Sequence, residues 1–240
     1  TFFIGAWDHG YNMRLEGKKY KDARNDDILR SFEWFYQILV EEKLPEGKVK
    51  MYLTGADTWI SRKEFRDVNA HKKQMYLGKK HANGSYALKT EIESAEDRFD
   101  FTYDPEHPVM SHGAESLLYT KEGIGSLLQD SPGTRSDVVS CISGPLSEDM
   151  DIVGQIKMHL TVSTDGDDTA FVFKIMEMTE EGKSYNIRTG ITTLGYRNGN
   201  KTRISYTPGE VVEIVIDSWD VAYRIKKGSR IRVDITSSDF

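Results

Sequence analysis

The stretch Ala170–Met178, which reads AFVFKIMEM, and the stretch Ser184–Thr192, which reads SYNIRTGIT, decide the fold of this 240-residue chain. Both are rich in β-branched and aromatic residues, and the turn cluster Glu180–Lys183 lies between them. Runs of this kind, bounded by turn residues, predict β-strands. Working outward, the same pattern fills the chain from residue 138 to its end. The further strands predicted there are Val138–Ile142, Ile152–Val162, Arg203–Tyr206, Val211–Ile216, Val221–Ile225 and Arg230–Ile235.

Many short strands separated by turns are typical of a β-sandwich or a jelly roll. The strand signal is weaker before residue 138. The alternation over Val49–Leu53 predicts a strand, and two further short strands are predicted at Gln74–Leu77 and Phe99–Tyr103. The segment Pro105–Pro132 has little periodicity, so we expect a long irregular connection there.

The first part of the chain has a different character. The apolar run Phe2–Ile4 stops at Gly5 and predicts a short buried strand of the kind found in parallel sheets. A loop follows, and Asp26 or Asp27 then predicts the start of a helix that should end before the breaker cluster Pro45–Gly47. One apolar face runs along this helix, formed by Ile28, Phe32, Phe35 and Leu39.

These patterns divide the chain near residue 47. Residues 1–47 are α/β-like and too few to fold alone, whereas residues 48–240 are all-β and numerous enough for a core of their own. The net charge is −6, and no basic patch dominates the sequence. Both features argue against a nucleic-acid partner. The sequence contains no run of about 18 apolar residues, so no membrane-spanning helix is predicted. The single cysteine excludes an internal disulfide framework and fits a reducing compartment best, so we expect a cytoplasmic protein, although a secreted protein without disulfides would have the same pattern.

The sequence contains no complete catalytic motif. The nucleophile pattern G-x-S-x-G is absent, and Gly182–Asn186 comes closest without the final glycine. Cys141 lies among apolar strand residues, so a packed thiol is favoured over a catalytic one. No two of the six histidines have a metal-binding helical spacing, and no cofactor is implied. The acidic loop Asp165–Asp168 is compatible with calcium, but a polar turn is the favoured interpretation.

His9 stands out because of its position. It follows a short apolar strand, and the carboxyl ends of such strands are where open α/β sheets place their chemistry. A histidine there could act as a general base, although a structural loop histidine is favoured on these grounds alone.

The segment Phe3–Gly10, which reads FIGAWDHG, resembles the histidine segment of the CocE/NonD and X-Pro dipeptidyl-peptidase hydrolases. Further motifs that resemble this family follow in the same order along the chain. They are Val49–Trp59, Gln74–Gly78, Phe101–Val109, Ile152–Gly154, Asp168–Phe171, Gly209–Glu210 and Arg230–Phe240, with Ala170 in place of an acidic residue of the family pattern.

The resemblance implies a galactose-binding-domain-like jelly roll at residues 48–240, truncated at its end, after a remnant of an α/β-hydrolase core at residues 1–47. It implies that His9 is the base of a Ser-Asp-His triad in a serine esterase or peptidase that works by acyl transfer. Because the family places the serine and the aspartate before the histidine, the chain alone is expected to be inactive.

The resemblance also implies the partners. They are a small-molecule ester or an amide or peptide substrate, and an upstream hydrolase domain of the same protein. A homo-oligomer is compatible with the sequence. Trp7 and Trp59 are candidates for lining the substrate cleft or the domain interface, with plain packing as the more frequent role of aromatic residues. A carbohydrate-binding or a purely structural jelly-roll module is the alternative function.

Overall fold

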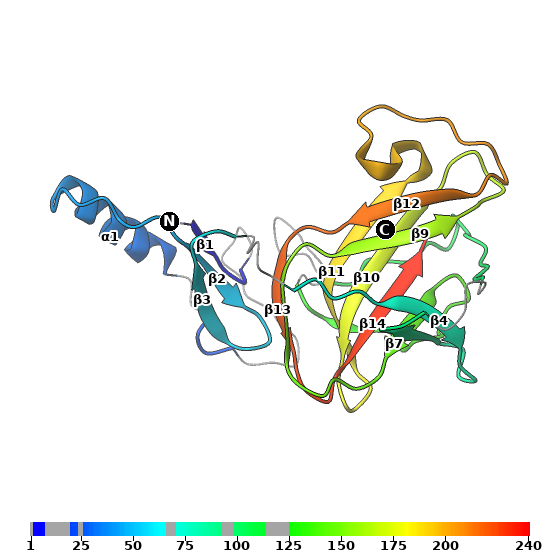
Figure 1. The fold of residues 1–240 in the computed structure, drawn as a ribbon, viewed down its shortest axis with the longest axis horizontal. Helices are drawn as coiled ribbons and strands as arrows, with labels where there is room; N and C mark the ends of the chain where they lie inside the picture. Colours follow the sequence, from blue (N-terminus) through cyan, green and yellow to red (C-terminus); the bar gives the residue numbers. More distant parts are fainter. Residues whose placement is uncertain (1, 8–19, 24–25, 66–70, 93–97, 114–124) are drawn as a thin grey trace.

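A computed structural model describes residues 2–7, 20–23, 26–65, 71–92, 98–113 and 125–240 (Figure 1). The larger part of the described chain is a two-layer β-sandwich. One layer is a seven-stranded sheet in the order β4-β5-β7-β14-β10-β11-β6, antiparallel except for the β5–β7 pair. Its strands are β4 (Tyr76–Lys80), β5 (Tyr86–Lys89), β6 (Leu128–Gln129), β7 (Val139–Ser143), β10 (Ala170–Met178), β11 (Ser184–Thr193) and β14 (Arg230–Thr236).

The second layer consists of two antiparallel strand pairs, one of β9 with β12 and one of β8 with β13. Their bounds are β8 (Met150–Gly154), β9 (Lys157–Val162), β12 (Val212–Asp217) and β13 (Val221–Ile225). A short 3-10 segment, η1 (Leu194–Gly199), lies against β12. In Figure 1, β9 and β12 cross in front of β10 and β11, and the core fills the space between the layers.

Strand alternation fills this core. On β10, Phe171, Phe173 and Ile175 belong to the core, and every second residue of β14 joins them. Phe173 is fully buried opposite Gly190 of β11, and a Cβ at Gly190 would lie 2.4 Å from the Phe173 ring. The ring therefore occupies the space that glycine leaves. Each fully buried side chain of this size contributes about 1.5–3 kcal/mol by leaving water.

The prediction of a mainly β sandwich is confirmed, but several elements differ. The predicted strand Ile152–Val162 is two strands, because the chain turns at Gly154 (φ 125°) and each half pairs with a different partner. Phe99–Tyr103 and Arg203–Tyr206 were wrongly predicted as strands. Their apolar side chains anchor irregular segments instead: Phe99 packs edge-on against Tyr86, with 4.3 Å between the ring centroids.

The N-terminal part forms a separate small unit at one end of the molecule. β1 (Phe2–Ile4) pairs in parallel with β2 (Val49–Leu53), and β2 pairs antiparallel with β3 (Thr58–Arg62). The helix α1 (Asp27–Leu39), with Asp26 at its N-cap, begins and ends as predicted and projects away from the sandwich in Figure 1. The division at residue 47 stays a prediction, and the β1–β2 ladder crosses it.

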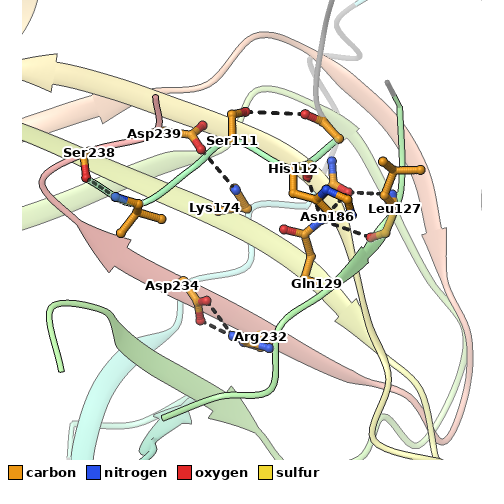
Figure 2. Close-up of polar contacts among 12 residues, drawn as sticks. Ser111, His112, Leu127, Gln129, Lys174, Asn186, Arg232, Asp234, Ser238 and Asp239 are labelled. Carbon is orange, nitrogen blue, oxygen red and sulfur yellow. Dashed lines mark hydrogen bonds and ion pairs between the residues drawn. The ribbon is translucent and has the colours of Figure 1, made fainter. Parts of the chain in front are cut away.

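The outer face of the large sheet is polar yet buried. Arg232 and Asp234, which alternate with core residues of β14, form a bidentate ion pair, and Lys174 of β10 lies 3.2 Å from Asp239 (Figure 2). The irregular connection predicted at 105–132 supplies further partners in its described parts. Asn186 accepts a hydrogen bond from the Leu127 backbone N–H at 2.8 Å, and its Nδ2 donates to the Gly125 carbonyl at 2.9 Å.

We expect Asn186→Ala to destabilise the fold by about 2–3 kcal/mol, because it leaves backbone groups of the connection without partners in a buried place. Urea unfolding of the purified chain measures this free energy. Asn200→Ala, which removes an exposed amide, is the matched control and should change it by less than about 0.5 kcal/mol. Equal stability of the two variants would contradict the anchoring role of Asn186.

Cys141 is a packed thiol, as the sequence predicts. It is fully buried in the core on β7, and burial raises its pKa to about 12. Since the thiolate is the reactive form, we expect no reaction of the native chain with Ellman's reagent at pH 8 and one thiol per chain in guanidinium. Stoichiometric reaction of the native chain, at the rate of the unfolded one, would contradict this expectation.

Candidate functional site

The predicted site residues fall in the small N-terminal unit. His9 lies outside the described residues, so its role stays a prediction. Trp7 and Trp59 are both half-buried, and their ring centroids lie 5.9 Å apart. The structure therefore brings together the residue two positions before His9 and a residue of β3, 52 positions further along the chain.

Trp59 is the centre of an aromatic cluster. Its neighbour across the β2–β3 ladder is Tyr52, at 5.6 Å between centroids, and Phe3 of β1 lies at 6.5 Å, both edge-on. The Arg30 guanidinium of α1 lies 5.4 Å from the Trp59 ring and 4.7 Å from the Phe3 ring, within the range of a cation–π contact. Three sequence segments therefore meet at one indole.

Polar bonds hold Lys21 and Asp22 on the β2–β3 hairpin. The Asp57 carboxylate accepts hydrogen bonds from the backbone N–H of Lys21 at 2.9 Å and of Asp22 at 3.0 Å, and from the Tyr52 hydroxyl at 2.6 Å. The Trp59 indole N–H donates to the Asp22 carbonyl at 2.8 Å. A single hairpin, β2–β3, thus holds residues 21 and 22 through both a carboxylate and an indole.

Electrostatics follow from these bonds. The hydrogen bond from Tyr52, followed by those from the two backbone N–H groups, holds the pKa of Asp57 below its ordinary range. Burial, reinforced by the hydrogen bond to Asp57, raises the pKa of the Tyr52 phenol. Burial also raises the pKa of Tyr20, whose ring packs edge-on against Tyr52, to about 12. The contacts therefore favour a charged Asp57 and neutral phenols.

The turn of this hairpin is tied to the sandwich. Thr54 donates its N–H to the Ala222 carbonyl at 3.0 Å and accepts from the Arg224 N–H at 2.7 Å. Gly55 has φ +85°, and a Cβ there would lie 2.2 Å from the Arg224 carbonyl oxygen. Glycine is therefore required for this close approach of the turn to β13.

A buried carboxylate lies behind β13. Glu177 of β10 is 1% exposed and accepts hydrogen bonds from the Tyr223 hydroxyl at 2.6 Å and the Ser229 hydroxyl at 2.9 Å. Burial and the negative charge of Glu177 raise the pKa of the Tyr223 phenol. These bonds fix β13 at the point where the hairpin turn docks on it.

Sequence reasoning missed the roles of Tyr52, Asp57 and Glu177. Gly55, Asp57 and Trp59 lie within a motif that resembles the family, but the motif names no partner. The partners of Asp57 are 35 and 36 residues away, and nothing in the local pattern indicates them.

Other candidate sites have structural contacts. Asp168 accepts hydrogen bonds from the Gly195 N–H and from Arg203. In the described part of the chain, no three His, Cys, Asp or Glu side chains gather as a metal ion would require. His159 lies exposed on β9, as predicted for the outer face of a strand. Within the described residues, no helix is both long and apolar enough to span a membrane.

The apolar face of α1 and the strand β1 are exposed. No residue of α1 is buried, and Phe32 and Leu39 are 71% and 72% exposed. Phe32, Phe35 and Leu39 of this face line a shallow hollow together with Glu33, Tyr36, Gln37, Val40 and Glu41. The prediction that Phe2–Ile4 is a buried strand is wrong for this chain, since all three residues are exposed. Among the described strands, β1 has a neighbour on one edge only, and Phe2 remains 73% exposed although Trp59 and Arg30 contact Phe3.

Comparison with known proteins identifies the family. Residues 43–240 match the model of the X-Pro dipeptidyl-peptidase C-terminal non-catalytic domain. The chain belongs to this family. It corresponds to the C-terminal portion of hydrolases of the CocE/NonD and X-Pro dipeptidyl-peptidase type, and the matched region is the domain described as non-catalytic.

Members of the family and solved structures agree with this. The chain is 27% identical over 197 residues to the cocaine esterase of Rhodococcus sp. (strain MB1 Bresler). The aligned region covers 80% of this chain and 34% of that protein. An α-amino acid ester hydrolase superposes with a TM-score of 0.73 and 25% identity, over 99% of this chain and 40% of its own. An aminopeptidase from the marine sediment archaeon Thaumarchaeota archaeon shares the fold, with a TM-score of 0.77 and 24% identity. The superposition covers 100% of this chain and 42% of the aminopeptidase chain. The chain thus spans less than half of the length of these relatives.

The pKa directions give a testable pH dependence for the hairpin. A lowered pKa of Asp57 stabilises the fold above about pH 4, and this contribution is lost as the pH falls through the folded-state pKa. We therefore expect Asp57→Asn to be less stable than the unmodified chain at pH 7 in urea unfolding. The difference should shrink below pH 4. A difference that is as large at pH 3 as at pH 7, or is absent at both, would contradict the charged state of Asp57.

Proposed function

We propose that this chain is the C-terminal part of a serine hydrolase that cleaves an ester or amide bond by acyl transfer, with His9 as the base of its triad. The observation that supports this most directly is the ordered series of family motifs, which begins with Phe3–Gly10 and continues through the matched domain. The names of the relatives, an esterase, an ester hydrolase and an aminopeptidase, support the same class of reaction.

In the proposed mechanism, the His9 imidazole takes the proton of an upstream serine hydroxyl as the serine oxygen attacks the substrate carbonyl carbon. The imidazolium then gives this proton to the leaving alcohol or amine, and an acyl-enzyme remains. Water, deprotonated by the same imidazole, hydrolyses the acyl-enzyme and restores the serine. An upstream aspartate would orient the imidazole, and the oxyanion donors would also come from upstream.

The exposed face of α1 and β1 supports an upstream partner. Contiguous apolar surface of this kind is costly in water and marks an interface. β1 pairs in parallel with β2 and, among the described strands, leaves its other edge open, as the last strand of an open α/β sheet would. We infer that an α/β-hydrolase core of the same protein, to which residues 1–47 belong, covers this face. Residues 48–240 form the accompanying sandwich, and Trp7 and Trp59 lie beside the cleft or the interface.

The single buried cysteine agrees with a cytoplasmic enzyme, and we include this location in the proposal. The substrate class follows from the reaction and stays broad: a small ester, or the amide bond of a peptide. None of the described contacts favours a carbohydrate ligand, so the jelly roll is proposed as an accessory to hydrolysis.

The test is the replacement His9→Ala in the full-length protein, assayed with p-nitrophenyl esters and aminoacyl-p-nitroanilides. We expect kcat/KM to fall by at least about a thousandfold, because the serine loses its base. His159→Ala, on the exposed face of β9, is the matched control and should keep full activity. The isolated 240-residue chain should show no turnover.

Labelling of the active serine with a fluorophosphonate should slow in parallel in His9→Ala, since the probe also needs an activated serine. Activity of His9→Ala within a few-fold of the His159→Ala control would overturn the proposal. So would turnover by the isolated chain, because it holds no serine elbow.

A further inference from the structure

We propose that Asn83 is a site of spontaneous deamidation, because Ser85 aims two hydrogen-bond donors at its side-chain carbonyl, whereas Asn198 is protected from the same reaction. The sequence contains two Asn-Gly pairs, Asn83-Gly84 and Asn198-Gly199. Their local sequences are alike at the reacting bond, but their surroundings in the fold are opposite. The proposal concerns a covalent modification of the sandwich and does not depend on the proposed function.

The reaction is the addition of a backbone nitrogen to a side-chain amide. The Gly84 nitrogen, after loss of its proton to water, bonds to Cγ of Asn83, and the amide oxygen Oδ1 becomes an oxyanion. The Cγ–Nδ2 bond then breaks, ammonia leaves with a proton taken from water, and a succinimide ring remains. Water opens the ring at either carbonyl, which gives aspartate or isoaspartate. Glycine favours the first step because it has no side chain beside the attacking nitrogen.

Ser85 provides two donors for the oxygen that gains the negative charge. Its backbone N–H lies 3.2 Å from Oδ1 of Asn83, and its hydroxyl lies 2.8 Å from the same atom. A backbone N–H can only donate, so the atom that both groups face is the amide oxygen. Ser85 is 2% exposed and directly precedes β5, so both donors are held in place. Donors preorganised at a developing oxyanion lower the barrier to addition.

The turn between β4 and β5 leaves the reacting groups open to water. Asn83 is exposed in this turn, so water can accept the proton and later open the ring. The Gly84 N–H donates to the His81 carbonyl at 3.0 Å, and this bond must open before addition. Opening an exposed turn bond costs little free energy. The two donors of Ser85 do not depend on that bond, because they join residues 83 and 85 directly.

Asn198 is bound at both ends of its amide. Its Oδ1 accepts from the Val215 N–H at 2.9 Å, and its Nδ2 donates to the Glu213 carbonyl at 3.2 Å. Both partners are backbone groups of β12, so the planar amide cannot rotate without breaking these bonds. Loss of ammonia would also remove the donor and leave a carboxylate against the Glu213 carbonyl. The contacts with β12 therefore oppose the reaction that the contacts with Ser85 favour at Asn83.

The experiment incubates the folded full-length protein at pH 8 and follows each Asn-Gly pair by peptide mapping with mass spectrometry. Isoaspartate is counted with a protein isoaspartyl methyltransferase. One oxyanion donor in a closed active site is worth about 100-fold or more, and we expect about 10-fold here because the turn is exposed to water. Asn83 should therefore be converted at least about 10-fold faster than Asn198. In guanidinium the two rates should become similar, because the contacts of the fold are gone.

Variants of Ser85 test the role of the hydroxyl. Ser85→Ala removes one donor and keeps the backbone donor, so the deamidation of Asn83 should slow about 10-fold. Ser85→Thr keeps the hydroxyl and should keep the rate close to that of the unmodified protein. Ser140→Ala removes another buried hydroxyl of the same sheet, on β7, and is the matched control. It should leave the rate at Asn83 unchanged.

A purely structural effect of Ser85 acts in the opposite direction. If the hydroxyl only stiffens the turn, Ser85→Ala loosens it and the deamidation of Asn83 accelerates. An unchanged or faster rate in this variant would therefore overturn the oxyanion role of Ser85. Similar rates at Asn83 and Asn198 in the folded protein would overturn the proposal as a whole. This comparison needs no variant, so it decides the question even if Ser85→Ala does not fold.

Discussion

The structure depends on one constraint. The seven-stranded sheet must pack apolar side chains on its inner face and pair buried polar side chains on its outer face. Its inner face packs apolar side chains such as Phe173 against the second layer, where every polar group would need a partner. Its outer face carries Lys174, Arg232 and Asp234, which are as deeply buried as the core. These charges pair with each other and with Asp239, and the connection adds the Asp130 carbonyl, which accepts a hydrogen bond from Arg232 at 2.6 Å. The irregular segment before β7 is therefore part of the fold rather than an appendage to it.

The same requirement explains the junction with the N-terminal unit. A sandwich edge that exposes backbone groups must pair them, and β13 pairs two of them with Thr54. Because Gly55 lets the backbones approach closely, the hairpin docks without a layer of side chains between. Few contacts join the two units, but they are backbone bonds and they fix direction.

Sequence patterns predicted the sandwich well because period-two alternation reports one buried face directly. β13 was predicted with its observed bounds for this reason, whereas β10, which is buried on both faces, was predicted with its observed bounds from its β-branched and aromatic residues. The same pattern was wrong at Phe99–Tyr103, since apolar side chains can anchor an irregular segment as well as a strand. Alternating apolar residues indicate which side chains are buried. They do not show that the backbone pairs with a neighbouring strand. In the candidate site, local sequence could indicate a turn at Gly55 but not which backbone groups Asp57 would bind.

The exposed face of α1 also shows what the sequence pattern does not predict. Its spacing of apolar residues predicts a helix correctly, yet the partner that this face requires is not among the described residues. An amphipathic helix is stable mainly through tertiary packing, and this requirement is the reason for the proposal that a hydrolase core covers the face. Trp59 lies where Arg30 of α1, Phe3 of β1 and the hairpin meet, on the side of the helix opposite to this face. The hairpin that carries Trp59 and Asp57 is also the one that Thr54 joins to β13 by two backbone bonds, so these aromatic and polar contacts are tied directly to the sandwich.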